Sequence, residues 1–366
     1  MSDQPAPGAN LGKAAMPEGM QRLRIGIAIV ATVGSFALQL TSLTVLTFIF
    51  TAGTLALLAT LVGDGTEQIG ARLGPGATGV LQSALGNLPE LFTGIFLLRA
   101  GLVNVLQAAL IGSVLGNSLL VLGLAFLLGG LKNGTQIFNP ETPRNIATLT
   151  LLAVSAIAIP TLASQLHTKA AAHVETLSVV CAAILLLVFV TSIPFSLKGG
   201  PGGVSSEKTE GTWPIGLAIA VLLGASVGAA FVSDWFVAAL TPATLALHIS
   251  PDFTGLVIVA IAGNAVENVV GVQLMLRNRP DFAISVILNS SLQVALALVP
   301  VLVLVSFVIG APIHLTLVLP PLLLGSMLLA TLLGALVVYD GESTWLEGIA
   351  LIGLYVIIAA GFWWGL

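Results

Sequence analysis

The sequence contains few charged residues. They make up 8% of its 366 positions, whereas an average soluble domain carries about 25%. So little charge cannot cover a surface that faces water on all sides, which excludes a soluble globular protein. The net charge is −4 and no run of Lys or Arg is present, so nothing in the composition supports nucleic acid as a partner.

Cysteine is almost absent. The one cysteine, Cys181, excludes a disulfide within the chain, and its apolar neighbours favour a small core residue. The four histidines are scattered and lack the spacing of a metal site. We therefore expect no resident cofactor.

Motifs of membrane-embedded enzymes are weak or missing. The HExxH motif of zinc proteases does not occur. Gly63-Asp64 and Tyr339-Asp340 faintly resemble the two aspartate motifs of intramembrane aspartyl proteases. However, Leu61 replaces the first glycine of GxGD, and the YD pair follows the GD pair instead of preceding it. An aspartyl protease is therefore a remote alternative, and we expect a protein that is not an enzyme.

Long apolar runs are abundant. Hydrophobic residues make up 57% of the chain, and many runs exceed the roughly 20 residues that a helix needs to cross a bilayer. We predict an all-α polytopic membrane protein, with the lipid bilayer as its surroundings and about eleven transmembrane helices. Their approximate limits are 25–41, 44–63, 76–98, 102–130, 146–164, 174–195, 214–239, 253–276, 281–309, 313–338 and 345–366.

The distribution of Lys and Arg predicts the orientation of the spans. With the N-terminus in the cytoplasm, ten of the 12 basic residues lie on the cytoplasmic side, and only Arg99 and Lys169 lie outside. Compact loops rich in Ala, Leu and Gly favour a prokaryotic inner membrane. We expect residues 1–24, which are polar and rich in Pro, Gly and Ala, to form a disordered cytoplasmic tail.

A repeat divides the chain after its first span. Residues 196–213 are rich in Gly, Ser and charge and read as a cytoplasmic linker. We therefore predict a first span at 25–43 and two five-span repeats at 44–195 and 214–366. An odd number of spans per repeat inserts the two repeats in opposite orientations, as in many secondary transporters.

The repeat is also visible in a polar motif. A shift of 177 residues aligns the sequence GNLPE at 86–90 with GNAVE at 263–267. The same shift aligns Ser113 with Ser290. Because the two spans that carry the motifs run in opposite directions, we expect the motifs to meet near the middle of the bilayer.

Two carboxylates at this depth predict a cation site. A charged side chain there costs about 2.5–3.5 kcal/mol on insertion scales. Helix packing alone is a poor reason for two such residues in matching motifs. Calcium binds six to eight oxygen ligands, including carboxylates and amide carbonyls. The oxygen-bearing candidates are Asn87, Glu90, Gln107, Ser113, Asn117, Asn264, Glu267, Asn289, Ser290, Ser291 and Gln293.

Two features near the motifs affect the backbone. Pro89 lacks an N–H, so the carbonyl of Leu85 would lose its helical partner and become available to an ion; a simple packing kink is the alternative. Gly86 gives access to the backbone, whereas the second motif has Val266 in place of the proline. A break in the second motif must therefore depend on Gly263.

The carboxylates also predict proton coupling. A buried carboxylate pair favours its protonated form, and a bound Ca²⁺ favours the ionised form. Glu90 and Glu267 would therefore hold either Ca²⁺ or protons, and the empty ionised state would be costly. Asp64 and Glu67, which we expect in a cytoplasmic-edge loop, and the deeper Asp234 are further candidates for the proton path; a solvated face is the alternative for the first two.

At these motifs the chain resembles the cation/calcium exchanger superfamily, and most closely its calcium/proton exchanger branch. That branch pairs a GNATEL-like motif with a GNAAEH-like motif. The likeness extends to residues 63–75, 105–130, 232–265 and 287–304. It implies eleven spans in an inverted repeat, alternating access, and a Ca²⁺/H⁺ antiporter. By motif, it assigns the shared ion site to Glu90 and Glu267, assisted by Gly86, Asn87, Gly263, Asn264, Gln107 and Gln293.

Departures from this pattern leave alternatives open. Pro89 makes the first motif similar to that of sodium/calcium exchangers, and Asn268 stands where the branch often has His. A sodium/calcium or other cation exchanger is therefore the main alternative, and a cation channel a remote one. We infer no obligate protein partner.

Overall fold

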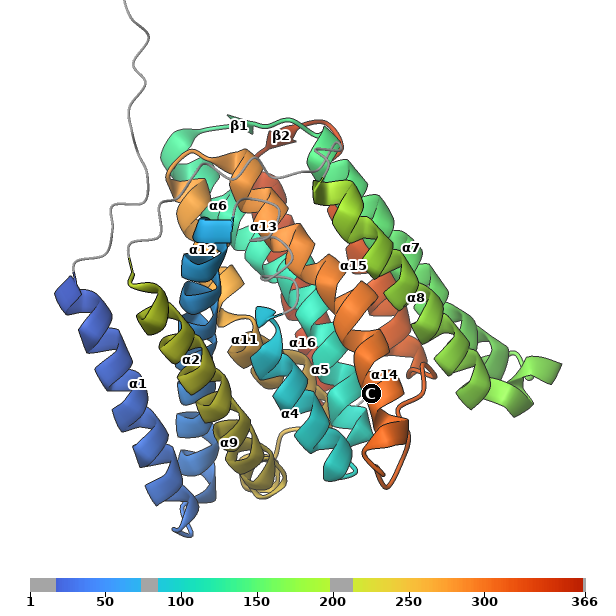
Figure 1. Ribbon diagram of the computed structural model, residues 1–366. Coiled ribbons are helices and arrows are strands. Elements are labelled where there is room, and N and C mark those ends of the chain that lie inside the picture. The colour runs from blue at the N-terminus through green and yellow to red at the C-terminus, as the bar shows by residue number, and fades with distance from the viewer. Residues whose placement is uncertain (1–17, 74–84, 198–212, 365–366) are drawn as a thin grey trace, which may run out of the picture.

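The chain folds into a bundle of helices. The computed structural model describes residues 18–73, 85–197 and 213–364, and Figure 1 shows most helices running along one direction. In the first half, the elements are α1 (Glu18–Gln39), α2 (Thr44–Leu73), α4 (Leu88–Arg99), α5 (Val103–Leu115), η1 (Gly116–Val121), α6 (Leu122–Asn133), β1 (Gln136–Ile137), α7 (Glu141–Gln165), η2 (Lys169–His173) and α8 (Val174–Leu197). In the second half, they are α9 (Ile215–Leu247), α10 (Pro251–Phe253), η3 (Thr254–Val259), α11 (Ala260–Gly263), α12 (Ala265–Leu276), α13 (Pro280–Gln293), η4 (Val294–Leu298), α14 (Val299–Val308), α15 (Pro321–Val337), β2 (Glu342–Ser343) and α16 (Trp345–Trp363).

The helices have the length and polarity of membrane spans. Among the described residues, eight helices are long and apolar enough to cross a bilayer. A ninth span is formed if the bent pair Pro251–Gly263 and Asn268–Leu276 counts as one, and α15 is a shorter apolar helix of 17 residues. The predicted all-α membrane class is confirmed, while the count of eleven stays a prediction.

Three helix boundaries differ from the predicted ones. Helix α2 continues ten residues past the predicted end at 63, and α9 extends to Leu247 instead of 239. Helix α1 begins at Glu18, inside the predicted tail, whose first 17 residues lie outside the described part. Most of the predicted linker, 198–212, also lies outside it. Hydropathy marks where apolar character stops, but a helix continues wherever its backbone hydrogen bonds remain available.

The predicted tenth span begins too early. Residues 313–320 are not helical, and α15 starts at Pro321. Two consecutive prolines, Pro320 and Pro321, explain the start, because a proline in the first turn needs no N–H and the residue before it avoids the helical conformation.

The helices form three groups. Figure 1 shows α1, α2 and α9 at one side of the bundle, α7 and α8 at the other, and α4, α5 and α11 between them. Stacked rings of Phe48 and Phe236, 5.0 Å apart, join α2 to α9. At one end, a short antiparallel ribbon of β1 and β2 pairs Gln136 with Ser343, and we call this the ribbon end of the bundle.

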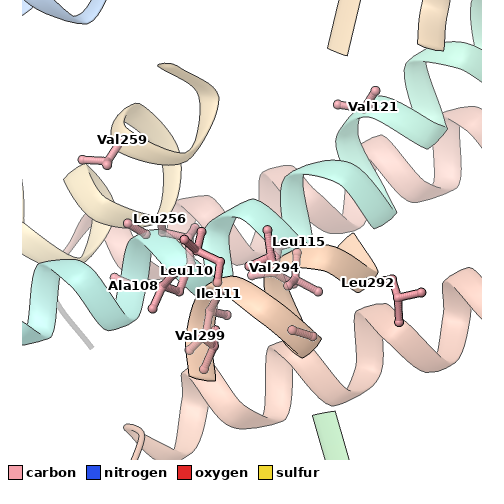
Figure 2. Close-up of a cluster of buried hydrophobic side chains, with 14 of the residues drawn as sticks. Ala108, Leu110, Ile111, Leu115, Val121, Leu256, Val259, Leu292, Val294 and Val299 are labelled. Atoms are coloured by element: carbon pink, nitrogen blue, oxygen red, sulfur yellow. The ribbon is translucent and has the colours of Figure 1, made fainter. Parts of the chain in front are cut away.

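The central helix α5 crosses η3 at very short range. A Cβ atom at Gly112 would lie 2.1 Å from the carbonyl oxygen of Leu256, and one at Gly255 would lie 2.4 Å from that of Val105. Figure 2 shows α5 passing between the η3 segment and the α13–α14 region, with Leu110 and Ile111 among the buried side chains. The two backbones therefore touch here, which only glycine permits.

Candidate functional site

Both motif segments lie directly before a helix, and the second also follows one, α11. Asn87 has φ −93° and ψ 17°, directly before α4, and Asn264 has φ −90° and ψ 20°, directly before α12. These nearly equal angles lie in the bridge region, where many active-site residues are found. At the second break the two helical pieces meet at 62°. The asparagine of the Gly-Asn pair thus has the same backbone conformation before the following helix in both halves.

The structure shows where Pro89 lies, while the predicted availability of the Leu85 carbonyl stays a prediction. The proline lies in the first turn of α4, where its missing N–H costs nothing, and the next turn is already formed by a hydrogen bond from Leu91 N to Asn87 O of 2.9 Å. The second motif breaks without a proline at the corresponding position, Val266. The break therefore rests on glycine and asparagine, and Pro89 begins the helix that follows it.

Glu90 lies directly against the other motif. A Cβ atom at Gly263 would be 2.8 Å from Glu90 Cγ and 3.2 Å from Glu90 Oε1. The first-motif carboxylate thus reaches the backbone of the second motif, as the sequence predicted. Glu267 lies in the first turn of α12, and its side chain is outside the described part of the structure.

Amides and hydroxyls connect the two halves of the chain around this contact. Asn87 Nδ2 donates to Gln293 Oε1 at 3.0 Å. Asn264 Nδ2 donates to Ser113 Oγ at 2.8 Å. Asn117 Nδ2 donates to Ser290 Oγ at 2.9 Å and to Asn264 Oδ1 at 3.1 Å. Each of these bonds joins a residue before the linker to one after it, so the breaks are held by the opposite half.

Asn117 and two neighbouring serines complete the network. Asn117 is 1% exposed, and its Oδ1 has no hydrogen-bond partner. Ser118 Oγ and Ser291 Oγ lie 3.2 Å apart. Asn117 and Ser118 belong to the π-helical turn η1, a distortion that is frequent at functional sites. A buried acceptor without a donor is what a cation ligand requires.

A small cavity adjoins the network. It has a volume of about 30 Å³, which is enough for a water molecule or a single desolvated ion. Its polar lining residues are Glu90, Thr93, Ser113 and Asn264, and the remaining wall is apolar. Among the described residues, no three His, Cys, Asp or Glu side chains come together. A hard cation here would thus be bound by carboxylate, amide and hydroxyl oxygens, the donors that such ions prefer.

Gln107 does not join this network. Its Nε2 donates to the carbonyls of Thr316 and Val318, at 3.0 and 3.1 Å, in the non-helical segment before α15. Gln293, the other glutamine that the resemblance assigns to the site, does reach the first motif through Asn87. The two glutamines therefore have different surroundings.

The three outlying acids lie apart from the cavity. Asp64 and Glu67 are inside α2, not in the predicted loop, and Asp64 pairs with Arg24 of α1 at 3.6 Å. A polar turn at the end of an apolar span was taken for a loop, although it continues the helix. Asp234 is exposed on α9, whereas Phe236, two residues later, is buried and lines the cavity.

Thr93 and Ser233 were missed from the sequence. Thr93 Oγ1 donates to Pro89 O at 2.9 Å and lies 3.1 Å from Ser233 Oγ, which connects α4 to α9. Thr93 follows Glu90 by three residues, so its position on the same helix face could have revealed it. Ser233 gives no such local signal, because its partner is distant in the sequence.

Comparison with known proteins agrees with this geometry. Residues 43–198 and 217–364 match the family model described as sodium/calcium exchanger protein. A protein of Synechocystis named Ca(2+)/H(+) antiporter is 35% identical, over 83% of this chain and 87% of the relative. The Ca(2+)/H(+) antiporter ChaA of Bacillus subtilis is 34% identical, over 84% and 89%.

Solved structures share the fold. The structure of native YfkE is similar with a TM-score of 0.79 and 32% sequence identity, covering 93% of this chain and 98% of that chain. The crystal structure of an H+/Ca2+ exchanger, CAX, has a TM-score of 0.71 over 94% and 92% of the two chains. At 16% identity, the latter shows the fold alone.

Proposed function

The chain belongs to the family of sodium/calcium exchanger proteins, and from this premise we propose that it is an antiporter that exchanges Ca²⁺ for H⁺ across a membrane. Relatives that are 32–35% identical carry the name Ca(2+)/H(+) antiporter. The chain covers 87–89% of their lengths. Calcium and protons are the transported substrates, and the mechanism requires no cofactor.

The contact of Glu90 with Gly263 carries the proposal. It brings the carboxylate of one motif to the break of the other, beside a cavity that accepts one small ion. We infer that Glu267 supplies the second carboxylate, because it follows its break by the same number of residues as Glu90. The further oxygen ligands are the side chains of Asn87, Ser113, Asn117, Asn264, Ser290, Ser291 and Gln293, with the backbone of Gly86 and Gly263.

Exchange follows from charge compensation. Two ionised carboxylates in a dry site repel each other, and either Ca²⁺ or protons relieve the repulsion. The empty ionised site is the costly state, so it does not cross the membrane. With two glutamates alone, the exchange ratio would be two protons per Ca²⁺. The cavity lining does not include Asp64, Glu67 or Asp234. A role of these acids in proton transfer would therefore belong to the entry path.

We further infer an inverted repeat of five spans per half. Support comes from the matching dihedral angles at Asn87 and Asn264. The π-helical turns η1 and η4 also lie at corresponding positions under the 177-residue shift. With α1 as an additional span, the total is eleven. The basic residues then place the N-terminus and the ribbon end in the cytoplasm, and the bacterial relatives favour an inner membrane.

Calcium uptake into proteoliposomes tests the function. We expect ⁴⁵Ca²⁺ accumulation when a pH gradient is imposed, and none when a sodium gradient is imposed at constant pH. Uptake that follows sodium and ignores pH would instead assign the chain to sodium/calcium exchange. Flux that needs neither gradient would indicate a channel.

Two variants test the shared carboxylates. Glu90→Gln and Glu267→Gln keep the shape of a protonated glutamate, so insertion and folding should survive. Each should abolish calcium uptake, because the charge that binds Ca²⁺ and releases the proton is gone. Substantial uptake by both variants would contradict the two-carboxylate site.

A further inference from the structure

Residues 311–320 form a non-helical segment whose second half, 315–319, packs between helices. The side chains of Leu315, Leu317 and Leu319 are 1%, 2% and 5% exposed, while the alternate residues Thr316 and Val318 are only partly buried. This period of two is that of a strand. The segment lies at the end of the bundle opposite the ribbon, between α14 and α15.

The segment has no strand beside it among the described residues, so side chains satisfy its backbone instead. Its N–H groups at 315, 317 and 319 donate to Ser306, Ser178 and Thr161, at 3.0, 2.9 and 2.9 Å. Thr161 Oγ1 also donates to Leu317 O at 2.9 Å, and Gln107 Nε2 donates to the carbonyls of 316 and 318.

These four polar side chains come from four helices. Gln107 lies on α5, Thr161 on α7, Ser178 on α8 and Ser306 on α14, and none is more than 5% exposed. Non-helical backbone at membrane depth is tolerated only where protein or a cavity satisfies it. The segment is therefore fixed to these helices at several points and is not a mobile loop.

A second cavity lies under the segment. It has a volume of about 20 Å³ and is lined by Gln107, Thr316 and apolar side chains. Leu110 forms part of the wall of this cavity and also of the one beside Glu90.

We propose that the 311–320 segment is a fixed seal at this end of the bundle, and that Gln107, Thr161, Ser178 and Ser306 are positioning residues that hold it. The seal keeps water out of the second cavity. Protons can therefore reach Glu90 only through the exchange cycle and not by leaking past the segment. Gln107 acts here through the backbone of the segment and is not a cation ligand. The proposal rests on the proposed proton-coupled function, since a leak past the site matters only in a coupled exchanger.

A proton-leak assay without calcium tests the seal. Proteoliposomes containing a trapped pH dye receive a pH jump, and the rate of its decay is measured for Thr161→Val, Gln107→Leu and the matched control Thr161→Ser. Valine keeps the shape of threonine but loses the hydroxyl, whereas serine keeps the hydroxyl. We expect several-fold faster decay for Thr161→Val and Gln107→Leu, and unchanged decay for Thr161→Ser.

Thiol labelling provides a second readout. In a Cys181→Ala background, Leu317→Cys should resist a membrane-impermeant maleimide, and adding Thr161→Val should make it reactive. If Thr161→Val does not fold, Ser178→Ala replaces it in the same comparison, because it removes the acceptor of the Leu317 N–H. Thermal unfolding in detergent verifies that each variant is folded.

The outcomes separate the two readings of Gln107. Gln107→Leu could lower the calcium affinity without a faster pH decay and without maleimide reaction at Leu317→Cys. That result would make Gln107 a cation ligand and overturn the seal. Reactivity of Leu317→Cys in the parent background would also overturn it. If the unsubstituted protein fails to exchange Ca²⁺ for H⁺, the proposed function fails, whereas the leak comparison does not depend on calcium.

Discussion

At the residue scale, the absence of a side chain at Gly263 determines where Glu90 lies. The Glu90 side chain occupies the volume that a Cβ atom would need, at 2.8 Å from its Cγ. Real Cβ atoms do not approach other carbons so closely, so any larger residue at 263 must displace Glu90. The glycine therefore shapes the proposed ion site by having no side chain.

We predict that Gly263→Ala weakens calcium transport. The added methyl group pushes the Glu90 carboxylate away from the second break, so the apparent Km for Ca²⁺ should rise at least several-fold. Overpacking typically costs about 1–3 kcal/mol, so some stability should also be lost. Gly53→Ala is the matched control, because a Cβ atom at this helical glycine meets nothing within 4 Å. Equal Km values for both variants would show that Glu90 does not depend on this contact.

Pro89→Ala should have a small effect. The break at Asn87 does not need the proline, so the ion site and its calcium affinity should persist. A proline that fits its backbone stabilises a protein by about 0.4–1 kcal/mol through the unfolded state, and the variant should lose that amount in thermal unfolding. A large fall in calcium affinity per folded molecule would restore a direct role for the backbone around Pro89.

The sequence marked the residues that the repeat carries, but it gave no sign of contacts between residues far apart in the chain. Asn87, Glu90 and Asn264 were recognised because the same pattern occurs twice. Gln107 was assigned to the ion site because its sequence neighbours resemble a family motif, but its partners lie more than 200 residues away at Thr316 and Val318. Local pattern cannot report such a contact.

At the element scale, the crossing of α5 and η3 determines how closely the two halves approach. Gly112 and Gly255 allow backbone contact there. Gly112 and Gly116 have the GxxxG spacing that is typical of close helix packing, but a Cβ atom at Gly116 would meet nothing within 4 Å. The spacing is thus informative, although only one of its two glycines lies in the interface.

We predict opposite results for these two glycines. Gly112→Ala should lower stability by about 1–3 kcal/mol or more, because its Cβ would lie 2.1 Å from a backbone oxygen that cannot move aside. Gly116→Ala should leave thermal unfolding unchanged or raise its midpoint. Equal stabilities in detergent would contradict the close crossing.

The extended segment before α15 shows a second limit at this scale. Residues 313–320 are apolar enough to be counted with the following helix, although Leu315, Leu317 and Leu319 alternate with a period of two. Hydropathy averages over a window, so it does not separate a buried strand from a buried helix. The two prolines at 320 and 321 were the signal that could have moved the boundary.

At the scale of the whole molecule, the distribution of charged residues, and not the fold, predicts the orientation in the membrane. Lys132, near the ribbon end, and Lys169, near the opposite end, are both exposed. The excess of basic residues on the ribbon side predicts that this side faces the cytoplasm.

Labelling of single cysteines checks this orientation. In a Cys181→Ala background, Lys169→Cys should react with an impermeant maleimide added to intact cells, and Lys132→Cys should react only after the membrane is permeabilised. The reverse pattern would invert the topology, and reaction of both in intact cells would indicate a missing span.

The bonds that join the two halves have a consequence for biogenesis. Asn87 is paired with Gln293, and Asn117 with Ser290. During synthesis, the first half enters the bilayer before the ribosome has made residue 260, so Glu90 has neither Gly263 nor the second set of amides beside it. The proposed ion site is therefore among the last features to form. A nascent chain that stops before residue 260 leaves Asn87, Glu90 and Asn117 without these partners.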